Sequence, residues 1–312
     1  MSAVAIVHPT DLLGKELRET MERRATSWNE VRLLSTLDDE VGTLTDAAGA
    51  ATIVQRYEPE ALKDISTLYL CGPIAGNRPI LGDVPADTLA VVLSFDAMPE
   101  DGQPVVAGIN TETARRGRPV LSPHPAVILL AHLLQPLQRL GLDLAVATVI
   151  QPASMAGNEG LEELFDSTRD IVAMTARRST PVFGAQLSFN LLPTALAADP
   201  LSAHLDVVLR EAPPVSLQIV QGGVFHGISA SVYVRCSSNP SPQALRKALL
   251  GNPHLEAADD PKHLGPIDAA ANEKVILGTP RRAADGGYWL WAVMDNLTRG
   301  GALNALEIAE AA

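Results

Sequence analysis

The stretch S-A-V-A-I-V-H-P-T-D-L-L-G, residues 2–14, places a short apolar run directly before a turn and the start of a helical pattern. Apolar residues then recur every four positions over residues 12–24, as one face of a helix requires. They are Leu13, Leu17 and Met21. A second apolar run, V-R-L-L, follows at 31–34. A strand, a helix and a second strand in this order predict a βαβ unit with parallel strands.

The pattern continues outward from this unit. Further strands are predicted at 67–71 and 89–95, each ending in a turn-rich segment, as strands buried between helices tend to do. Up to residue 122 the sequence therefore predicts a doubly wound, Rossmann-type α/β domain. Beyond it the spacing changes to that of a mixed α+β domain. Strands are predicted at 144–150, 215–220, 229–236 and 288–293, and helices at 123–141, 159–178, 192–209 and 304–312.

Composition limits the classes of function. The chain has 312 residues and a net charge of -12, which lacks the basic footprint of nucleic-acid binding. Its longest apolar runs are shorter than the roughly 20 residues of a membrane span, and its N-terminus does not resemble a signal peptide. Two cysteines exclude a disulfide framework and a cysteine metal cluster. We expect a cytoplasmic protein with neither a nucleic acid nor a membrane as partner, and no metal site.

Four segments carry a more specific pattern. They are S-F-N-L-L-P at 188–193, V-F-H-G-I-S at 224–229, V-I-L-G-T-P-R-R at 275–282 and D-N-L-T-R-G-G-A-L-N-A at 295–305. In this order they resemble F-N-x-I-P, V-F-x-G-H-S, V-x-V-G-R-I-R-R and D-N-L-R-K-G-A-A-x-N-A of the aspartate-semialdehyde dehydrogenase family. The resemblance covers essentially the whole chain, and it includes the Usg-type relatives that bacteria keep beside a true dehydrogenase.

The resemblance implies a division into two domains. Residues 1–122 would form the dinucleotide-binding domain, completed by the C-terminal residues 294–312. Residues 123–293 would form the dimerisation and catalytic-type domain of a homodimer. Members of the family use NADP to reduce an acyl phosphate to an aldehyde, through a thioester on a cysteine.

The catalytic residues of the family are mostly replaced. Its P-N-C-S motif resembles S-P-H-P-A at 122–126, which puts Pro125, a residue without a nucleophilic atom, at the cysteine position. Ile228 stands at the position of the acid–base histidine, and Gln221 at that of the substrate-binding arginine. Gln151 alone matches the family. Neither Cys71 nor Cys236 aligns with the nucleophile, so we expect the fold without the reaction.

The nucleotide turn departs from the family less completely. Its G-A-T-G-A-V-G becomes H-P-T-D-L-L-G at 8–14, which retains Thr10 and Gly14 but has His8 and Asp11 at the first two glycine positions. A carboxylate at Asp11 would repel a phosphate. The arginine that would meet a 2′-phosphate is also missing, since Ser35 precedes T-L-D. The resemblance leaves Thr10, Gly14, Ser35 and Asn296 as a degraded cofactor site, binding NAD or NADP weakly if at all.

Other interpretations stay open. His124, His226 and Gln151 could form a new site in a remodelled cleft, or be leftover polar residues. Thr10 or Asp11 could cap the following helix, and the D-D-E run at 38–40 is expected to be a solvated loop. The leading function is a catalytically inactive homologue that binds or scaffolds, with an active family member as a possible partner. The alternatives are an NAD(P)-dependent oxidoreductase acting on an aldehyde or oxo group without cysteine, and an active dehydrogenase whose cysteine lies elsewhere.

Overall fold

The computed structural model describes residues 3–24, 28, 30–47, 49–175, 179–194 and 198–312. The chain folds as two compact units, Met1–Pro125 with Gly300–Ala312, and Ala126–Arg299. The first has the Rossmann-type α/β fold, and the second contains a mixed sheet, so the predicted fold class is confirmed. Among the described helices, none is both long and apolar enough to cross a membrane.

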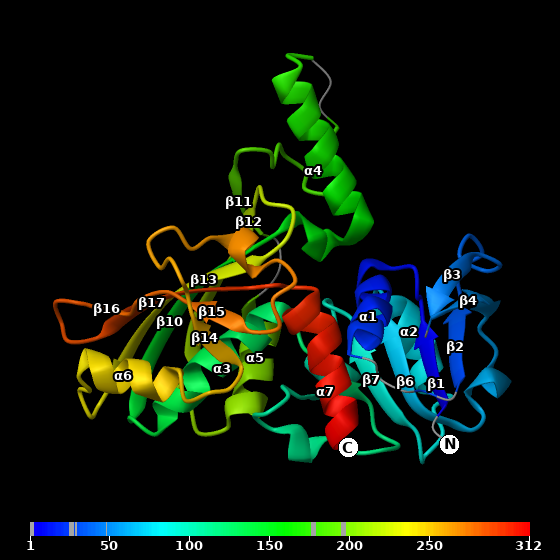
Figure 1. Ribbon diagram of the computed structural model, residues 1–312, viewed down its shortest axis with the longest axis horizontal. Helices are drawn as coiled ribbons and strands as arrows, with labels where there is room; N and C mark the ends of the chain where they lie inside the picture. The colour runs from blue at the N-terminus through cyan, green and yellow to red at the C-terminus, as the bar shows by residue number, and fades with distance from the viewer. Residues whose placement is uncertain (1–2, 25–27, 29, 48, 176–178, 195–197) are drawn as a thin grey trace. The chain divides into compact units, whose positions relative to one another are not determined.

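The first unit is built on a parallel sheet of seven strands (Figure 1). In spatial order they are β5 (Gln55–Arg56), β2 (Glu30–Ser35), β1 (Ala3–Val7), β6 (Ile65–Cys71), β7 (Leu89–Leu93), β9 (Val120–Leu121) and β8 (Gln103–Pro104). All five residues of β1 are buried, because helices cover both faces of the sheet. The chain leaves β1 towards β2 on one side, whereas β6 and β7 extend the sheet on the other. The carboxyl ends of β1 and β6 therefore flank the topological switch point, where open α/β sheets bind their ligands.

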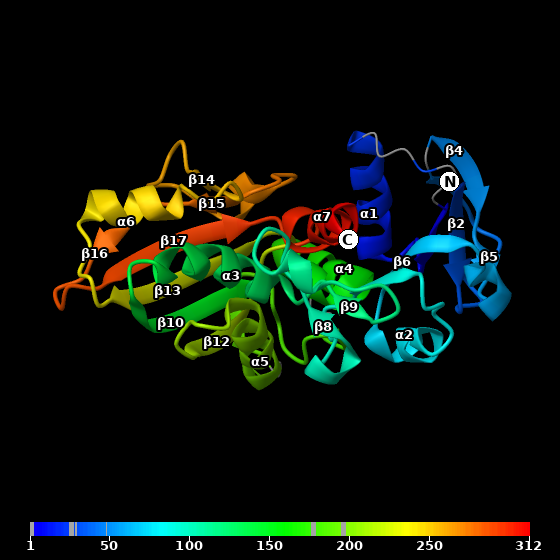
Figure 2. The same ribbon diagram turned by 90° about the horizontal axis from the view of Figure 1, so that it is seen from below.

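Three helices flank this sheet. Figure 2 shows α1 (Leu12–Arg23) and α7 (Leu303–Ala311) on one side and α2 (Ile74–Leu81) on the other. The C-terminal helix is held by Asn304, whose Oδ1 accepts from the N–H of Ala107 at 2.9 Å. The Nδ2 of the same side chain donates to Ser122 Oγ, also at 2.9 Å. This buried amide ties the last helix of the chain to the N-terminal unit.

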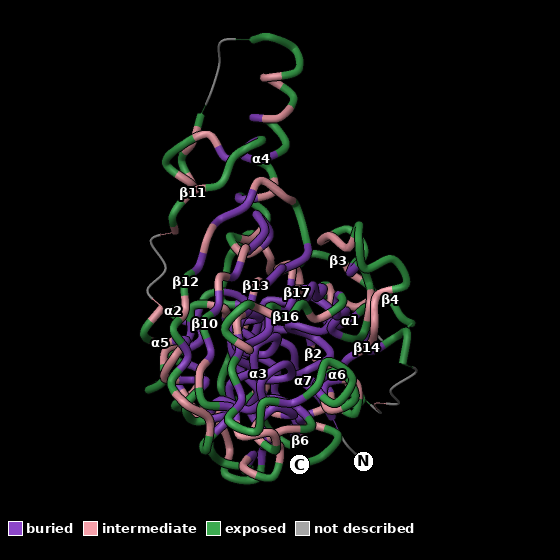
Figure 3. The backbone as a smooth tube through the Cα atoms, turned by 90° about the vertical axis from the view of Figure 1, so that its left-hand side faces the viewer, coloured by how far each residue is buried: buried purple, intermediate pink, exposed green. Residues whose placement is uncertain are grey.

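The second unit contains a mixed sheet. Its strands are β11 (Leu191–Pro193), β12 (Val215–Gly222), β10 (Leu142–Gln151), β13 (Ile228–Cys236), β17 (Tyr288–Met294), β15 (Val275–Leu277) and β14 (Leu255–Ala257), with β16 (Arg281–Arg282) on β17. Its helices are α3 (Pro125–Gln138), α4 (Gly157–Val172), α5 (Ala198–Leu209) and α6 (Pro242–Leu249). Figure 3 shows α3, α5 and α6 on one side of the sheet, with the buried residues concentrated between them.

Two predicted helices of this unit need correction. The helix predicted over 159–178 ends at Val172, because Met174 takes a left-handed φ of 54° that a helix cannot continue. Residues 176–178 lie outside the described part. Of the helix predicted over 192–209 the structure describes Ala198–Leu209, residues 195–197 lie outside the described part, and Leu191–Pro193 pair with β12 as a strand. Pairing with a neighbouring strand overrides the local preference there.

Short elements complete the fold. They are the hairpin of β3 (Leu44–Ala47) and β4 (Ala50–Ile53), the 3-10 turns η1 (Pro59–Leu62), η2 (Pro99–Asp101), η3 (Thr111–Thr113), η4 (Ala153–Ala156) and η5 (Pro266–Ala269), and the π-helical turn η6 (Thr298–Ala302). The hairpin was not predicted from the sequence. It receives a hydrogen bond from Arg18 of α1, which donates to the carbonyl oxygen of Asp46.

Gly14 is required by packing at the start of α1. A Cβ at this position would lie 2.8 Å from the Cα of Pro9, closer than real Cβ atoms approach backbone. The turn and the first helical residues therefore cannot separate enough to admit a methyl group. Gly82, after α2, would place its Cβ at an ordinary 3.5 Å from the Pro79 carbonyl oxygen.

We predict that Gly14→Ala lowers the free energy of unfolding by about 1–3 kcal/mol, as overpacked sites do. Gly82→Ala serves as the control, and it should change stability much less. Thermal unfolding followed by circular dichroism measures both. Equal effects of the two substitutions would contradict the tight approach at Gly14.

Candidate functional site

The turn between β1 and α1 lies at the carboxyl end of β1, which is paired on both sides within the sheet. His8, the first residue after β1, has a φ of 54°, in the left-handed region that favours glycine. The turn thus has a glycine-like backbone at the residue that the resemblance aligns with a glycine. Asp11 caps α1, its side chain accepting from the N–H of Leu13 at 3.0 Å. The expected capping role is therefore confirmed for Asp11.

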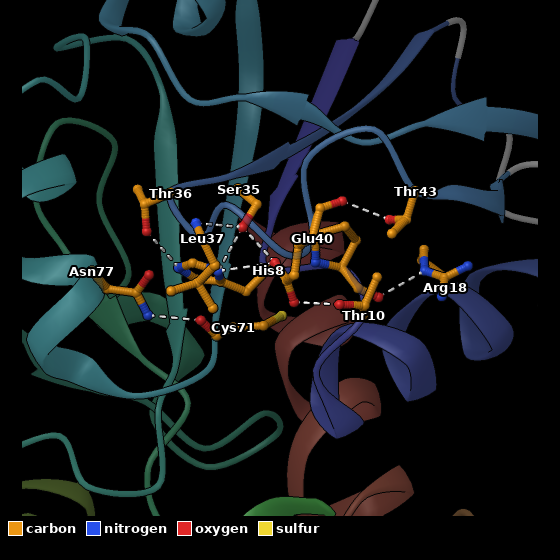
Figure 4. Close-up of polar contacts among 11 residues, drawn as sticks. His8, Thr10, Arg18, Ser35, Thr36, Leu37, Glu40, Thr43, Cys71 and Asn77 are labelled. Carbon is orange, nitrogen blue, oxygen red and sulfur yellow. Dashed lines mark hydrogen bonds and ion pairs between the residues drawn. The ribbon is translucent and has the colours of Figure 1, made fainter.

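A single carboxylate joins the turn to the end of β2. Glu40 accepts hydrogen bonds from the hydroxyls of Thr10 and Ser35, and its Oε2 lies 3.2 Å from His8 Nδ1 (Figure 4). Because an ionised carboxylate only accepts, the Nδ1 of His8 carries the proton in this contact. The other ring nitrogen lies 3.3 Å from the hydroxyl oxygen of Thr36. Five polar side chains thus form one network.

The charge of Glu40 is stabilised within this network. Burial alone would raise its pKa, but hydrogen bonds from His8, Ser35 and Thr10 outweigh burial, and its pKa lies below the ordinary value. Asp11 behaves oppositely. Its pKa is raised, chiefly by burial and further by the neighbouring charge of Glu40, despite the bond from the Leu13 N–H. Two acidic groups therefore stand at the turn that would receive a pyrophosphate.

The imidazole of His8 lies inside the unit. The residue is only 3% exposed. A Cβ at Gly72 would lie 3.6 Å from its Cδ2, and one at Gly76 would lie 3.7 Å from its Nε2. The ring thus packs against the segment from the end of β6 into α2, on the opposite side of β1 from β2. The ring therefore lies at the switch point, where open α/β sheets bind their ligands.

The structure brings together two of the residues that the resemblance aligns with the family's catalytic positions. Gln151 at the end of β10 pairs directly with Gln221 on the parallel strand β12. Gln151 Nε2 donates to Gln221 Oε1 at 2.9 Å, and Gln221 Nε2 donates to the Gln151 carbonyl oxygen at 3.2 Å. Both side chains are buried. An arginine would present two donors to a carboxylate. Here each Nε2 donates a hydrogen bond to the other residue of the pair.

Ile228 and His226 are two residues apart in the chain, but Ile228 is buried and His226 is exposed. Ile228 is the first residue of β13 and is fully buried, paired with Met294. His226 lies in the loop before β13, ahead of the strand predicted at 229–236, and Gly227 with a φ of 86° separates it from β13. There it is exposed and lines an open cavity of about 540 Å³ with Phe225 and residues of α4.

His124 and Pro125 lie at the start of α3. Pro125 is the first residue of the helix. His124 is buried, 6.0 Å between ring centroids from Phe95, and belongs to the first unit. His226 belongs to the second, so a shared site of the two histidines stays a prediction.

Both cysteines are buried in their strands. Cys71 ends β6 and Cys236 ends β13. Burial raises the pKa of Cys71 well above its ordinary value, and it raises the pKa of Cys236 to about 11. Both thiols are therefore protonated at neutral pH, whereas a nucleophile needs the thiolate. Among the described residues, no group of three or more metal-ligating side chains is suitably placed for a metal ion.

Asn296 is bound within the second unit. Its Oδ1 accepts from the N–H of Gly227 at 2.9 Å, and its Nδ2 donates to Ser154 Oγ at 3.0 Å. The side chain is fully buried and fastens η4 to the loop before β13. Of the predicted cofactor-site residues, Thr10 and Ser35 meet at Glu40, Gly14 supports the turn, and Asn296 stands in the other unit.

Glu40 was missed by sequence reasoning, which expected the D-D-E run at 38–40 to be solvated. Asp38 and Asp39 are exposed, but the side chain of Glu40 is only 11% exposed. The correction has a physical cause: the loop after β2 turns back onto the β1–α1 turn. The sequence of three acidic residues does not show which of them points inward. In the structure Glu40 does, because its carboxylate accepts a hydrogen bond from Thr10.

Comparisons with known proteins find relatives of two names, USG-1 protein homolog and aspartate-semialdehyde dehydrogenase. No family model matches the chain. The chain is 28% identical to a USG-1 protein homolog of Azotobacter vinelandii and 24% identical to an aspartate-semialdehyde dehydrogenase of Bacillus subtilis. Each match covers 98% of this chain and 96% of the relative. Relatives with both names therefore match along nearly the whole sequence.

Solved structures share the fold. A probable aspartate-semialdehyde dehydrogenase from Pseudomonas aeruginosa superposes with a TM-score of 0.91 over 99% of this chain and 97% of its own, at 22% identity. Aspartate semialdehyde dehydrogenase II from Vibrio cholerae gives a TM-score of 0.87 over 99% of this chain and 97% of its own, also at 22% identity. At such identity the likeness establishes the fold.

Glu40→Gln should lower the free energy of unfolding at pH 7 by about 1–3 kcal/mol, since it removes a charged acceptor of several hydrogen bonds. Because the folded pKa of Glu40 is depressed, its stabilisation is present above the unfolded pKa. It is lost as the pH falls through the folded pKa. The difference from the wild type should therefore shrink in acid.

Urea unfolding at several pH values measures this effect. Glu58→Gln is the control, since Glu58 lies exposed before η1 with no side-chain cap hydrogen bond. A difference for Glu40→Gln that stays constant from pH 7 to acid would argue against a charged Glu40 at the centre of the network.

Proposed function

We propose that this chain is a divergent member of the aspartate-semialdehyde dehydrogenase family that keeps the family fold without its reaction. It acts as a binding or scaffolding homologue. Relatives named USG-1 homolog and aspartate-semialdehyde dehydrogenase both match along 98% of the chain, which supports the family assignment.

The observation that carries the loss of catalysis is the pair Gln151–Gln221. Parallel pairing of β10 and β12 puts the two residues side by side at the strand ends, as a substrate site would need. Their amides then bond to one another. Such a pair offers no permanent charge to a carboxylate or phosphate substrate, and opening it would leave buried amide groups unpaired.

The nucleophile and the acid–base group are replaced as well. Pro125 at the start of α3 has no nucleophilic atom, and Ile228 cannot transfer a proton. Cys71 and Cys236 are buried and protonated at neutral pH, which supports the inference that neither forms a thioester. Three different chemical roles thus lack a suitable residue at the aligned positions.

The assembly we propose is a homodimer formed through the sheet of the second unit. Across β12, β10, β13 and β17 one row of paired residues faces away from the helices: Ser216, Val146, Tyr233 and Trp289. Val146 is 39% exposed and Trp289 is 38% exposed. The rings of Tyr233 and Trp289 meet edge to face with centroids 5.3 Å apart. Tyrosine and tryptophan are enriched where proteins associate. An active family member is a second partner that this face could accept.

The purified protein should show no NADP- and phosphate-dependent oxidation of aspartate semialdehyde above the rate of a heat-denatured sample. The expected reason is the absence of a thiolate, an acid–base group and a substrate clamp. A spectrophotometric assay of NADPH formation measures the rate. The double variant Cys71→Ser/Cys236→Ser is the matched control. Turnover that the native protein shows and this variant loses would mean that one of the cysteines is the nucleophile, and the proposal would be wrong.

Val146→Arg should convert the homodimer to a monomer, because a guanidinium would be buried in the interface without a partner. Sedimentation velocity measures the mass. Ile53→Arg, which makes the same change at a 56% exposed residue of β4, should leave the dimer intact. If the native protein sediments as a monomer, or if both variants remain dimeric, the sheet face is not the interface.

A further inference from the structure

Three hydrogen-bond donors of the first unit converge on one point. They come from two segments: His8 and Thr10 from the turn after β1, and Ser35 from the end of β2. Ser35 is fully buried and His8 nearly so. All three bond to the carboxylate of Glu40, which enters from the loop after β2. Two hydroxyls and an imidazole N–H around one negative group make up the donor set of an anion site.

These three donors lie where proteins of this fold bind their ligands. They are at the carboxyl ends of β1 and β2, beside the switch point between β1 and β6. Open parallel sheets bind phosphate-bearing ligands in this crevice. Here the negative group belongs to the chain itself.

We propose that Glu40 is an internal ligand, whose carboxylate occupies a phosphate site formed by His8, Thr10 and Ser35. A carboxylate and a phosphate present similar acceptor oxygens, so the same three donors serve either. The site is closed while Glu40 is in place and takes a phosphate group when the carboxylate is removed. The inference concerns the first unit alone and does not depend on the loss of catalysis in the second.

The surroundings explain why the internal ligand stays bound. The main chain of its loop is fastened by the hydroxyl of Thr43, which donates to the Glu40 carbonyl oxygen at 2.7 Å, and by the N–H of Gly42, which donates to the Val54 carbonyl oxygen at 2.9 Å. A tethered carboxylate loses little freedom on binding, whereas a free phosphate must give up its translational freedom. Asp11, on the same turn, adds further opposition to an external anion.

The test compares inorganic phosphate binding to the wild type, to Glu40→Ala and to the control Glu58→Ala by isothermal titration at pH 7, at constant ionic strength in sodium chloride. Glu40→Ala should bind phosphate at least about tenfold more tightly than the wild type, because hydrogen bonds to a charged acceptor are each worth more than this factor. Glu58→Ala should behave as the wild type. Adding Thr10→Val and Ser35→Ala to Glu40→Ala should remove the gain.

NAD⁺ is the second probe. A gain with phosphate alone, or with phosphate and NAD⁺, supports the internal ligand and tells how much of a nucleotide the site admits. No gain with phosphate, or a gain that survives loss of the Thr10 and Ser35 hydroxyls, overturns it. If Glu40→Ala is unfolded in chloride, phosphate should restore its folded fraction by mass action, and failure to do so also overturns the proposal. The dehydrogenase assay is independent of all these outcomes.

Discussion

The carboxylate of Glu40, held by Thr10, Ser35 and His8, is the interaction on which the character of the first unit depends. It links the turn after β1 to the loop after β2 at the edge of the sheet where this fold binds ligands. In a Rossmann-type domain the phosphate groups of a cofactor ordinarily accept hydrogen bonds at this place. Here a residue of the chain accepts them.

The second unit follows the same principle by different chemistry. The sheet carries Gln151 and Gln221 to adjacent strand ends, where the Nε2 of Gln151 donates to the Oε1 of Gln221. Ile228 packs in the core at the first residue of β13. We propose that in both units contacts within the chain replace the contacts that a ligand would make. This replacement is why a fold shared with dehydrogenases at a TM-score of 0.91 does not by itself imply their activity.

Much of the framework was predictable from the sequence. The runs that became β1, α1, β2, β10, β13 and β17 have strong periodicity, and burial of one face or both enforces it. Asp11, which caps α1, was one of the two residues predicted to do so, the other being Thr10. Short elements were missed or misjudged: the β3–β4 hairpin is held by tertiary contacts, and β11 is a strand only because β12 lies beside it. The inward turn of Glu40 depends on a contact with a residue thirty positions away, which local patterns cannot show.

The central claim of this account is that the crevice of the first unit is filled from within and holds no dinucleotide. Thermal unfolding of the native protein in the presence of NAD, NADH, NADP and NADPH tests it most directly. A ligand present at about 100 times its dissociation constant would stabilise the fold by roughly 2.7 kcal/mol. We predict no shift of the unfolding midpoint with any of the four at millimolar concentration. A clear shift with one of them would show that His8 and Glu40 leave room for the cofactor, and it would contradict the account.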